Sequence, residues 1–194
     1  MNKKFAAVGI ALSLTLGLTN CTGSIANAEQ LNIETKPVMQ KSVNFNLVAS
    51  LTLMQKQHLR LQKVEQNTTK MNKLLKYLKS RHNKTPYVFA GSNPQWGWDC
   101  SGLVRWTYEN FGIELRHSAT AQGHVGKKVS YKEAKPGDIV TFSWGSDYWK
   151  YHAAIYLGNG MIVNANSGYG TTVVQPLTDF KGNKITFRRL VQTN

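Results

Sequence analysis

Residues 99–108, Asp-Cys-Ser-Gly-Leu-Val-Arg-Trp-Thr-Tyr, decide how the fold is organised, because they predict a short buried helix. Asp99 is a good N-cap residue for this helix, and Gly112 is a good residue just beyond its C-terminus. The side chains of Leu103, Val104 and Trp106 make most of the helix surface apolar. The helix is therefore expected to lie inside a domain, with Cys100 in its first turn.

Outward from this helix, the chain toward the C-terminus reads as a run of strands. Residues 135–138, Lys-Pro-Gly-Asp, predict a turn, and Gly158-Asn159-Gly160 predicts a hairpin. The strands expected around these turns are Ile139–Phe142, Tyr151–Leu157, Met161–Ala165, Val173–Pro176 and Ile185–Val191. One or two helices followed by antiparallel strands predict an α+β domain over residues 69–194.

The composition supports a folded domain with an acidic partner. Hydrophobic residues make up 41% of the 194 residues, which is enough to build a core and excludes a wholly disordered chain. The chain holds 24 Lys and Arg against 10 Asp and Glu, a formal net charge of +14. Only two cysteines occur, which excludes a disulfide-dense scaffold. Beyond the N-terminus no apolar run is long enough to span a membrane.

Residues 1–28 have the pattern of a secretory signal peptide. Lys3 and Lys4 precede an apolar stretch at residues 5–18, and Ala26-Asn27-Ala28 is a small-x-small cleavage site. We therefore expect a secreted protein associated with the cell wall, with no stable membrane span after signal removal. Lipidation of Cys21 is the alternative. Removal of the signal leaves Cys100 as the single cysteine, and its thiol is either buried and unreactive or has a chemical function.

Residues 29–68 are predicted to form a basic N-terminal segment that starts as a linker and becomes helical. Two amphipathic helices are expected, separated by a polar break at residues 67–69; their apolar positions are Leu47, Leu51, Met54, Leu61 and Val64, then Met71, Leu74, Leu75 and Leu78. Residues 56–84 hold nine basic residues and one acidic residue, a net charge of +8. This segment is either a solvated helix face or a cationic patch for anionic cell-wall polymers. Export argues against nucleic acid as the partner.

Cys100 and His152 are the candidate nucleophile and base. Backbone N–H groups and the positive end of a helix lower the pKa of a thiol in the first turn, so Cys100 is expected to be reactive. Of the five histidines, only His152 opens a strand, which holds an imidazole rigidly. No spacing of histidines or other ligands predicts a metal site, and no cofactor is expected.

A Cys–His pair usually needs a third group that fixes the imidazole tautomer, and the predicted hairpin offers two. With a three-residue loop at Gly158-Asn159-Gly160, Ala154 pairs with Asn164, which places Asn164 diagonal to His152 on the same face. In the same register Asn166 lies directly opposite His152. Asn164 is the more interior of the two and is the preferred candidate.

Several motifs resemble, in order and spacing, those of the NlpC/P60 peptidases, a papain-like cysteine peptidase family of bacterial cell walls. The nucleophile motif is matched by residues 99–104 and the histidine strand by residues 152–160; the other matches are Thr85–Gly91, Gly112–Leu115 with Ser118 and Gln122, and Lys135–Val140. The family's third polar residue falls about twelve positions after the histidine, which here is Asn164, although His is common there. Arg116 stands where Pro is common, and Ala154 where Gly is common.

The resemblance implies a papain-like α+β fold with N-terminal helices packed on a central antiparallel β-sheet. It implies hydrolysis of peptidoglycan stem peptides by Cys100, His152 and Asn164, typically at the γ-D-glutamyl bond to the diamino acid. Oxyanion or substrate contacts are expected from Tyr87, Asp99, Ser101 and Trp98, and six aromatic residues could wall a groove for a sugar-peptide strand: Trp96, Trp98, Trp144, Tyr148, Trp149 and Tyr151. The alternatives are an amidase or cross-bridge endopeptidase of the CHAP type, and a catalytically inactive cationic wall-binding module.

Overall fold

A computed structural model describes residues 37–194, with side chains from residue 49 onward. Residues 48–194 form one compact unit. The predicted signal peptide, with Cys21, and the first part of the predicted linker lie outside the described residues. The helices are α1 (Pro37–Ser80), α2 (Cys100–Glu109) and α3 (Ala119–Gln122), with 3₁₀ turns η1 (Tyr131–Glu133) and η2 (Leu177–Phe180). The strands are β1 (Ser92–Asn93), β2 (Gly97–Trp98), β3 (Lys127–Val129), β4 (Ile139–Ser143), β5 (His152–Gly158), β6 (Met161–Asn166), β7 (Thr171–Pro176) and β8 (Lys184–Arg189).

Six strands form one antiparallel sheet in the order β3-β8-β4-β5-β6-β7. In the β5–β6 hairpin, Ile155 pairs with Val163 and Tyr156 with Ile162, which confirms the predicted register. A β-bulge follows at Gly158, where the backbone takes a φ of 88° that glycine adopts readily. This register places His152 and Asn164 on the same face of the sheet.

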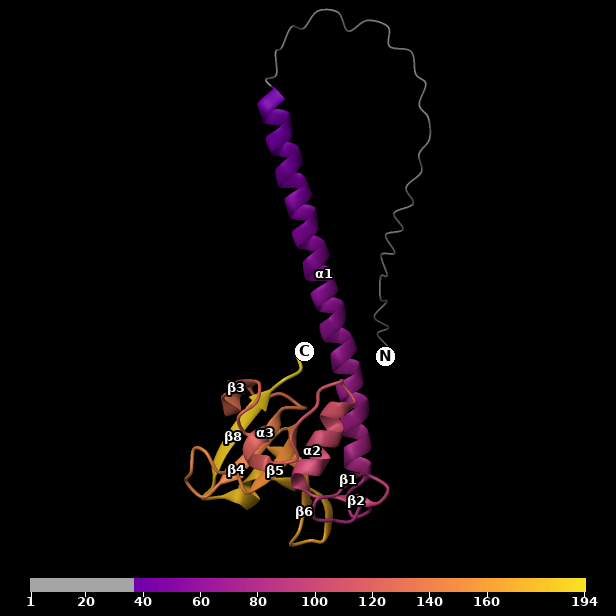
Figure 1. Cartoon of the computed structure of the whole chain (residues 1–194), viewed down its shortest axis with the longest axis vertical. Helices are drawn as coiled ribbons and strands as arrows, with labels where there is room; N and C mark the ends of the chain where they lie inside the picture. The colour runs from indigo at the N-terminus through magenta and orange to yellow at the C-terminus, as the bar shows by residue number, and fades with distance from the viewer. Residues whose placement is uncertain (1–36) are drawn as a thin grey trace, which may run out of the picture. The chain divides into compact units, whose positions relative to one another are not determined.

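The sheet is buried on both faces, and the helices cover one of them (Figure 1). On the helical face, side chains of α1 and α2 pack against the central strands; they are Met71, Leu75, Leu78, Leu103, Val104 and Tyr108, against Ile139, Ile155 and Val163. On the other face Phe142, Tyr156 and Ile162 pack with Leu177 and Phe187. The predicted α+β class, with N-terminal helices on a central antiparallel sheet, is confirmed.

The polar break predicted at residues 67–69 is wrong, because α1 runs through it. The Thr68 hydroxyl donates to the Val64 carbonyl at 2.8 Å, four residues back in the same helix. The same hydroxyl accepts from the backbone N–H of Asn194 at 2.9 Å, and Asn67 donates to the Gln192 carbonyl at 3.2 Å. The C-terminal residues therefore satisfy the polar groups that favoured a break. The predicted boundary between residues 68 and 69 falls inside this helix, and the segment predicted to start as a linker is helical from Pro37.

Within residues 37–194, no helix combines the length and apolarity needed to cross a membrane.

Candidate active site

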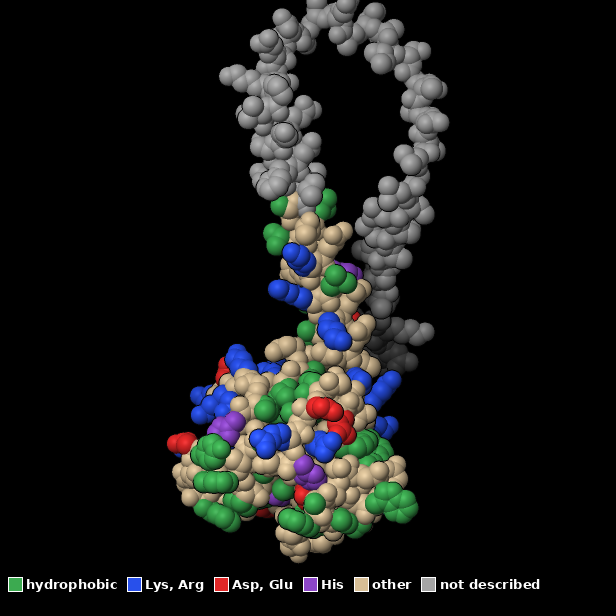
Figure 2. Space-filling model, in the orientation of Figure 1, with side chains coloured by type: hydrophobic (Ala, Val, Ile, Leu, Met, Phe, Trp, Pro, Cys, Tyr) green, Lys and Arg blue, Asp and Glu red, His purple; other side chains and the backbone are tan. Residues whose placement is uncertain are grey.

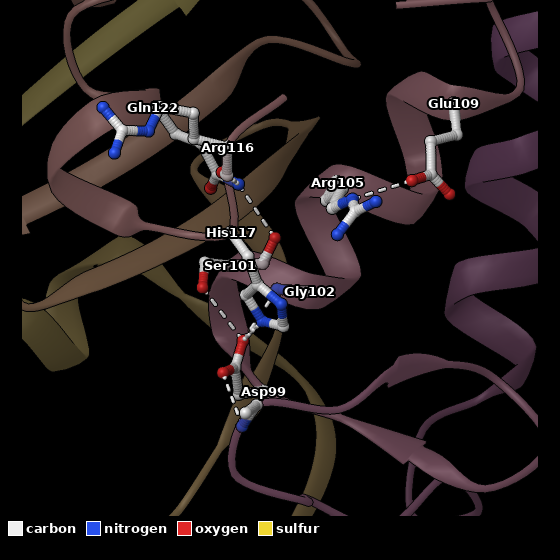
Figure 3. A network of polar contacts seen from close by, with 9 residues as sticks. Asp99, Ser101, Gly102, Arg105, Glu109, Arg116, His117 and Gln122 are labelled. Carbon is white, nitrogen blue, oxygen red and sulfur yellow. Dashed lines mark hydrogen bonds and ion pairs between the residues drawn. The ribbon is translucent and has the colours of Figure 1, made fainter. Parts of the chain in front are cut away.

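The first turn of α2 is fixed by Asp99, whose carboxylate collects four donors. Its Oδ1 accepts from the Gly102 N–H at 2.7 Å and from the Ser101 hydroxyl at 3.0 Å, and it lies 2.8 Å from His117 Nε2. Its Oδ2 accepts from the Ala90 N–H at 3.0 Å. Figure 3 shows the side chains of Ser101 and His117 converging on Asp99. The predicted N-cap is confirmed, and it sets the position of Cys100, the next residue.

The charge of Asp99 is stabilised by these contacts. Burial alone would raise the pKa of this carboxyl group. The hydrogen bonds from Gly102, His117 and Ser101 outweigh burial and hold the pKa below its ordinary value. Asp99 is therefore a buried carboxylate that stays ionised beside the candidate nucleophile.

Gly102 allows the loop before the helix to approach the helix closely. A Cβ at this position would lie 2.0 Å from the Gly91 carbonyl oxygen, so any side chain would force the two segments apart. The Gly91 carbonyl also accepts from the Asp99 N–H at 3.0 Å. A glycine is thus required at position 102, because the Gly91 carbonyl packs directly against the first turn of α2.

Cys100 lies against the start of β5, where the Ala153 N–H interacts with its sulfur. Burial raises the pKa of the Cys100 thiol above its ordinary value. The N–H groups of Ala153, Ser101 and Cys100 itself lower the pKa, whereas the charge of Asp99 raises it further. The expectation of a lowered pKa is wrong, because the helix-end argument leaves out burial and the neighbouring carboxylate.

His152 is the first residue of β5, and its side chain is enclosed by aromatic rings. The ring centroid lies 5.6 Å from that of Phe180, with an interplanar angle of 15°, and 5.7 Å from that of Phe142. Burial lowers the pKa of His152, and the hydrogen bond to Asn164 opposes this shift only in part. The imidazole therefore favours its neutral form.

Asn164 is fully buried in β6, and its Oδ1 accepts a hydrogen bond from His152 Nε2 over 2.9 Å. Because an amide oxygen can only accept, Nε2 is the protonated nitrogen of the neutral ring and Nδ1 is its free acceptor. Asn166 does not compete, since its own Oδ1 accepts from the Gly168 N–H at 2.9 Å. The structure thus brings His152 together with Asn164, as the register predicted.

A second amide and a carboxylate extend this contact, and the sequence analysis missed both. Asn164 Nδ2 lies 3.3 Å from Gln175 Oε1 and 3.4 Å from the Val173 carbonyl, and Gln175 Nε2 donates to Asp179 Oδ2 at 3.2 Å. We call the series His152–Asn164–Gln175–Asp179 the amide relay. The available signal was Gln175 itself, a polar residue between apolar neighbours in β7.

The other predicted site residues divide into two groups. Tyr87 lies close to the candidate nucleophile: burial raises the pKa of its phenol, and the charges of Cys100 and Asp99 raise it further. Trp98 is fully buried and donates from its indole N–H to the Thr172 hydroxyl at 2.7 Å, so its predicted substrate contact is wrong. Asp99 and Ser101 are also buried, and their side chains hold the helix start.

In the part of the chain that the structure describes, no cluster of three or more His, Cys, Asp or Glu side chains could hold a metal ion.

Comparisons with known proteins agree on one family. A family model of the NlpC/P60 family matches residues 84–188. The bifunctional muramidase/DL-endopeptidase CwlT of Bacillus subtilis is 44% identical over 100 residues, 50% of this chain and 29% of the relative. The gamma-DL-glutamyl hydrolase of the same organism is 41% identical over 102 residues, 52% of this chain and 25% of the relative. The match therefore spans less than a third of either relative's length.

A solved structure supports the same assignment. The crystal structure of the NlpC/p60 domain of peptidoglycan hydrolase SagA is 28% identical, with a TM-score of 0.52. The match covers 63% of this chain and 98% of that domain. Together with the family match over more than half of the 194 residues, this shows that the chain belongs to the NlpC/P60 family.

Proposed function

We propose that this chain is a cysteine peptidase that cleaves peptidoglycan stem peptides at the bond between γ-D-glutamate and the diamino acid. The observation that carries the proposal is the contact of 2.9 Å between His152 Nε2 and Asn164 Oδ1, next to the Ala153 N–H that meets the Cys100 sulfur. Relatives named DL-endopeptidase and gamma-DL-glutamyl hydrolase support this bond as the target.

In this mechanism Cys100 and His152 begin as a neutral pair. Burial raises the pKa of the thiol and lowers that of the imidazole, so the proton rests on sulfur. As the sulfur attacks the amide carbonyl, its proton passes to His152 Nδ1, the nitrogen that Asn164 leaves free. The resulting imidazolium gives this proton to the leaving amine as the C–N bond breaks, and an acyl-enzyme thioester remains. Water, deprotonated by the same imidazole, then hydrolyses the thioester and restores the thiol.

Two donors are proposed to stabilise the oxyanion. The Cys100 N–H lies at the start of the ten-residue helix α2, where the helix dipole favours negative charge. The raised pKa of Tyr87 keeps its phenol protonated at neutral pH, so it can donate a hydrogen bond. One such donor contributes about 3 kcal/mol to stabilisation of the transition state.

The proposed site of action is the cell wall, outside the cell. The signal pattern of residues 1–28 supports secretion, and the net charge of +8 over residues 56–84 supports binding to anionic wall polymers. In the structure Lys56, Arg60 and Lys63 lie exposed on α1, where they can reach such a polymer.

Mass spectrometry of peptidoglycan fragments tests the proposal. Purified protein and its Cys100→Ala variant are incubated with sacculi of defined chemistry. The expected products end in γ-D-glutamate on one side and begin with the diamino acid on the other, and the variant yields none. Peptides released intact from the glycan would identify an amidase instead, and no products from either protein would favour a wall-binding module.

A further inference from the structure

The loop between β4 and β5, residues 144–151, exposes four aromatic side chains immediately before His152. The exposed fractions are 79% for Trp144, 61% for Tyr148, 70% for Trp149 and 38% for Tyr151. Figure 2 shows that hydrophobic side chains gather along the lower rim of the domain, below most of the Lys and Arg side chains. Apolar surface in contact with water is unfavourable, and a cluster of exposed aromatic side chains is typical of an interaction site.

The loop is held in place although its rings are exposed. The hydroxyl of Ser146 accepts from the N–H groups of Tyr148 and Trp149 at 3.1 and 2.9 Å. The carbonyl of Ser146 accepts from the Ser143 hydroxyl at 2.6 Å and from the Lys150 ammonium at 3.2 Å. These bonds fix the turn that carries the aromatic residues, so a ligand meets a preformed surface.

Two of the rings form a flat platform that extends toward the active site. The rings of Trp144 and Tyr151 are stacked, with centroids 4.0 Å apart and an interplanar angle of 5°. The Tyr151 ring centroid lies 6.2 Å from that of His152, and the Tyr151 hydroxyl donates to Asn183 Oδ1 at 2.9 Å. One indole face of Trp144 is covered by this stacking, and the exposure of the residue shows that much of its remaining surface is open.

Beside the platform lies a cavity of about 250 Å³; it is lined by Trp144, Ser146, Trp149, Lys150 and Tyr151. Both charged side chains of the loop already have partners within the protein. The Lys150 ammonium is bonded to Ser146, and Asp147, the one carboxylate of the loop, is paired with Lys184. A flat aromatic surface with little free charge favours an uncharged ligand that has one apolar face and several hydroxyl groups.

We propose that the loop 144–151 is a subsite for a sugar ring of the peptidoglycan glycan strand. A pyranose has a face of C–H groups that packs on an aromatic ring, and hydroxyl groups at its edge that can form hydrogen bonds with the polar residues of the cavity, Ser146 and Lys150. With the sugar on Trp144 and Trp149, the attached peptide would extend past Tyr151 to His152 and Cys100. This inference rests on the proposed function and adds that the glycan-bearing peptide is the preferred substrate.

Paired substrates test the subsite: a disaccharide-linked stem peptide and the same peptide without sugar. We expect Trp144→Ala and Trp149→Ala each to raise KM for the sugar-bearing substrate about 3- to 10-fold, the range of one aromatic contact, with kcat unchanged. Cleavage of the sugar-free peptide should not change. Trp144→Phe, which keeps a ring, should retain most of the affinity. The matched control is Tyr131→Ala, which removes a 58% exposed ring from η1, outside the loop.

A binding measurement separates this inference from the proposed hydrolysis. The Cys100→Ala protein is titrated with glycan strands freed of peptide, and the heat of binding is measured by calorimetry. A binding signal that disappears when Trp144→Ala or Trp149→Ala is combined with Cys100→Ala supports the subsite, even if the protein cleaves nothing. Two results would overturn it: an equal loss for both substrates, which would mean that the loop only supports His152, or the absence of any response to the glycan.

Discussion

Replacing Gln175 by Met tests whether the amide relay sets the tautomer of His152. The Asn164 amide can take two orientations, related by a flip that exchanges its oxygen and nitrogen. In the present orientation its nitrogen lies 3.3 Å from Gln175 Oε1. A flip would set two acceptor oxygens against each other there, and would turn the amide nitrogen toward His152 Nε2. Gln175 is itself oriented by its bond of 3.2 Å to Asp179.

The structure bounds the size of the effect. Met matches the length of Gln175 but removes its acceptor, so Asn164 Nδ2 keeps only the contact of 3.4 Å to the Val173 carbonyl. If the two orientations become equal in free energy, half of the molecules carry the wrong tautomer and kcat falls about twofold. If the flipped form becomes favoured by about 1.4 kcal/mol, a typical worth of one buried hydrogen bond, kcat falls about tenfold. KM should not change, because the substrate contacts are untouched.

The assay combines steady-state kinetics on a soluble stem peptide with NMR of the His152 ring nitrogens, which reports where the proton resides. The matched control is Asp179→Asn, which still offers an acceptor to Gln175 and should keep both kcat and the tautomer. Wild-type kcat in Gln175→Met, together with a proton that stays on Nε2, would refute the reasoning. The Val173 carbonyl alone would then be sufficient to orient Asn164.

Three further predictions concern pH, stability and salt. Because burial lowers the pKa of His152 below its ordinary 6.5, the acid limb of the pH profile of kcat/KM should lie below pH 6.5; an acid limb above pH 6.5 would contradict this assignment. Because burial raises the pKa of the Cys100 thiol, Cys100 should react with iodoacetamide at pH 7 more slowly than a free thiol. Asp99→Ala should lower the free energy of unfolding in urea by about 1–2 kcal/mol, whereas Asp99→Asn, which can still accept from Gly102, should cost less; equal losses would exclude the cap as the cause. Binding to anionic walls through residues 56–84 should weaken as the salt concentration rises, since exposed charges are screened within about 8 Å at physiological ionic strength. Cleavage of soluble peptides should not depend on salt in this way. Wall binding that is independent of salt would exclude this role for the segment.

Local patterns were enough to predict the part of the site that lies within one hairpin. The glycine-flanked turn at residues 158–160 and the alternation of faces along β5 and β6 placed Asn164 diagonal to His152, and both features lie within fifteen residues. The N-cap at Asp99 is similarly local, since its acceptor reaches an N–H three residues away. Contacts between residues so close in the sequence depend on local geometry, and the rest of the fold leaves them unchanged.

The failed predictions depend on contacts between distant segments. Residues 67–69 have the composition of a helix break, but Thr68 meets Asn194, which is 126 residues away in the chain. The raised pKa of Cys100 arises from burial under β5, which no property of the helix start reveals. Gln175 joins the site across neighbouring strands, so only the sheet order shows that it faces Asn164.

The same features that raise the pKa of Cys100 give the proposed enzyme a protected resting state. Burial, and to a smaller extent the charge of Asp99, raises the pKa values of both Cys100 and Tyr87, so the thiol and the phenol stay protonated beside a neutral imidazole. Thiolate, the form that is alkylated and oxidised, then develops only as His152 takes the proton during attack on a bound amide. For an enzyme proposed to work outside the cell with a single cysteine, storing the proton on sulfur limits oxidative loss of the nucleophile. Asp99 thereby joins two roles, since the carboxylate that caps α2 also helps to keep the nucleophile in its protected form.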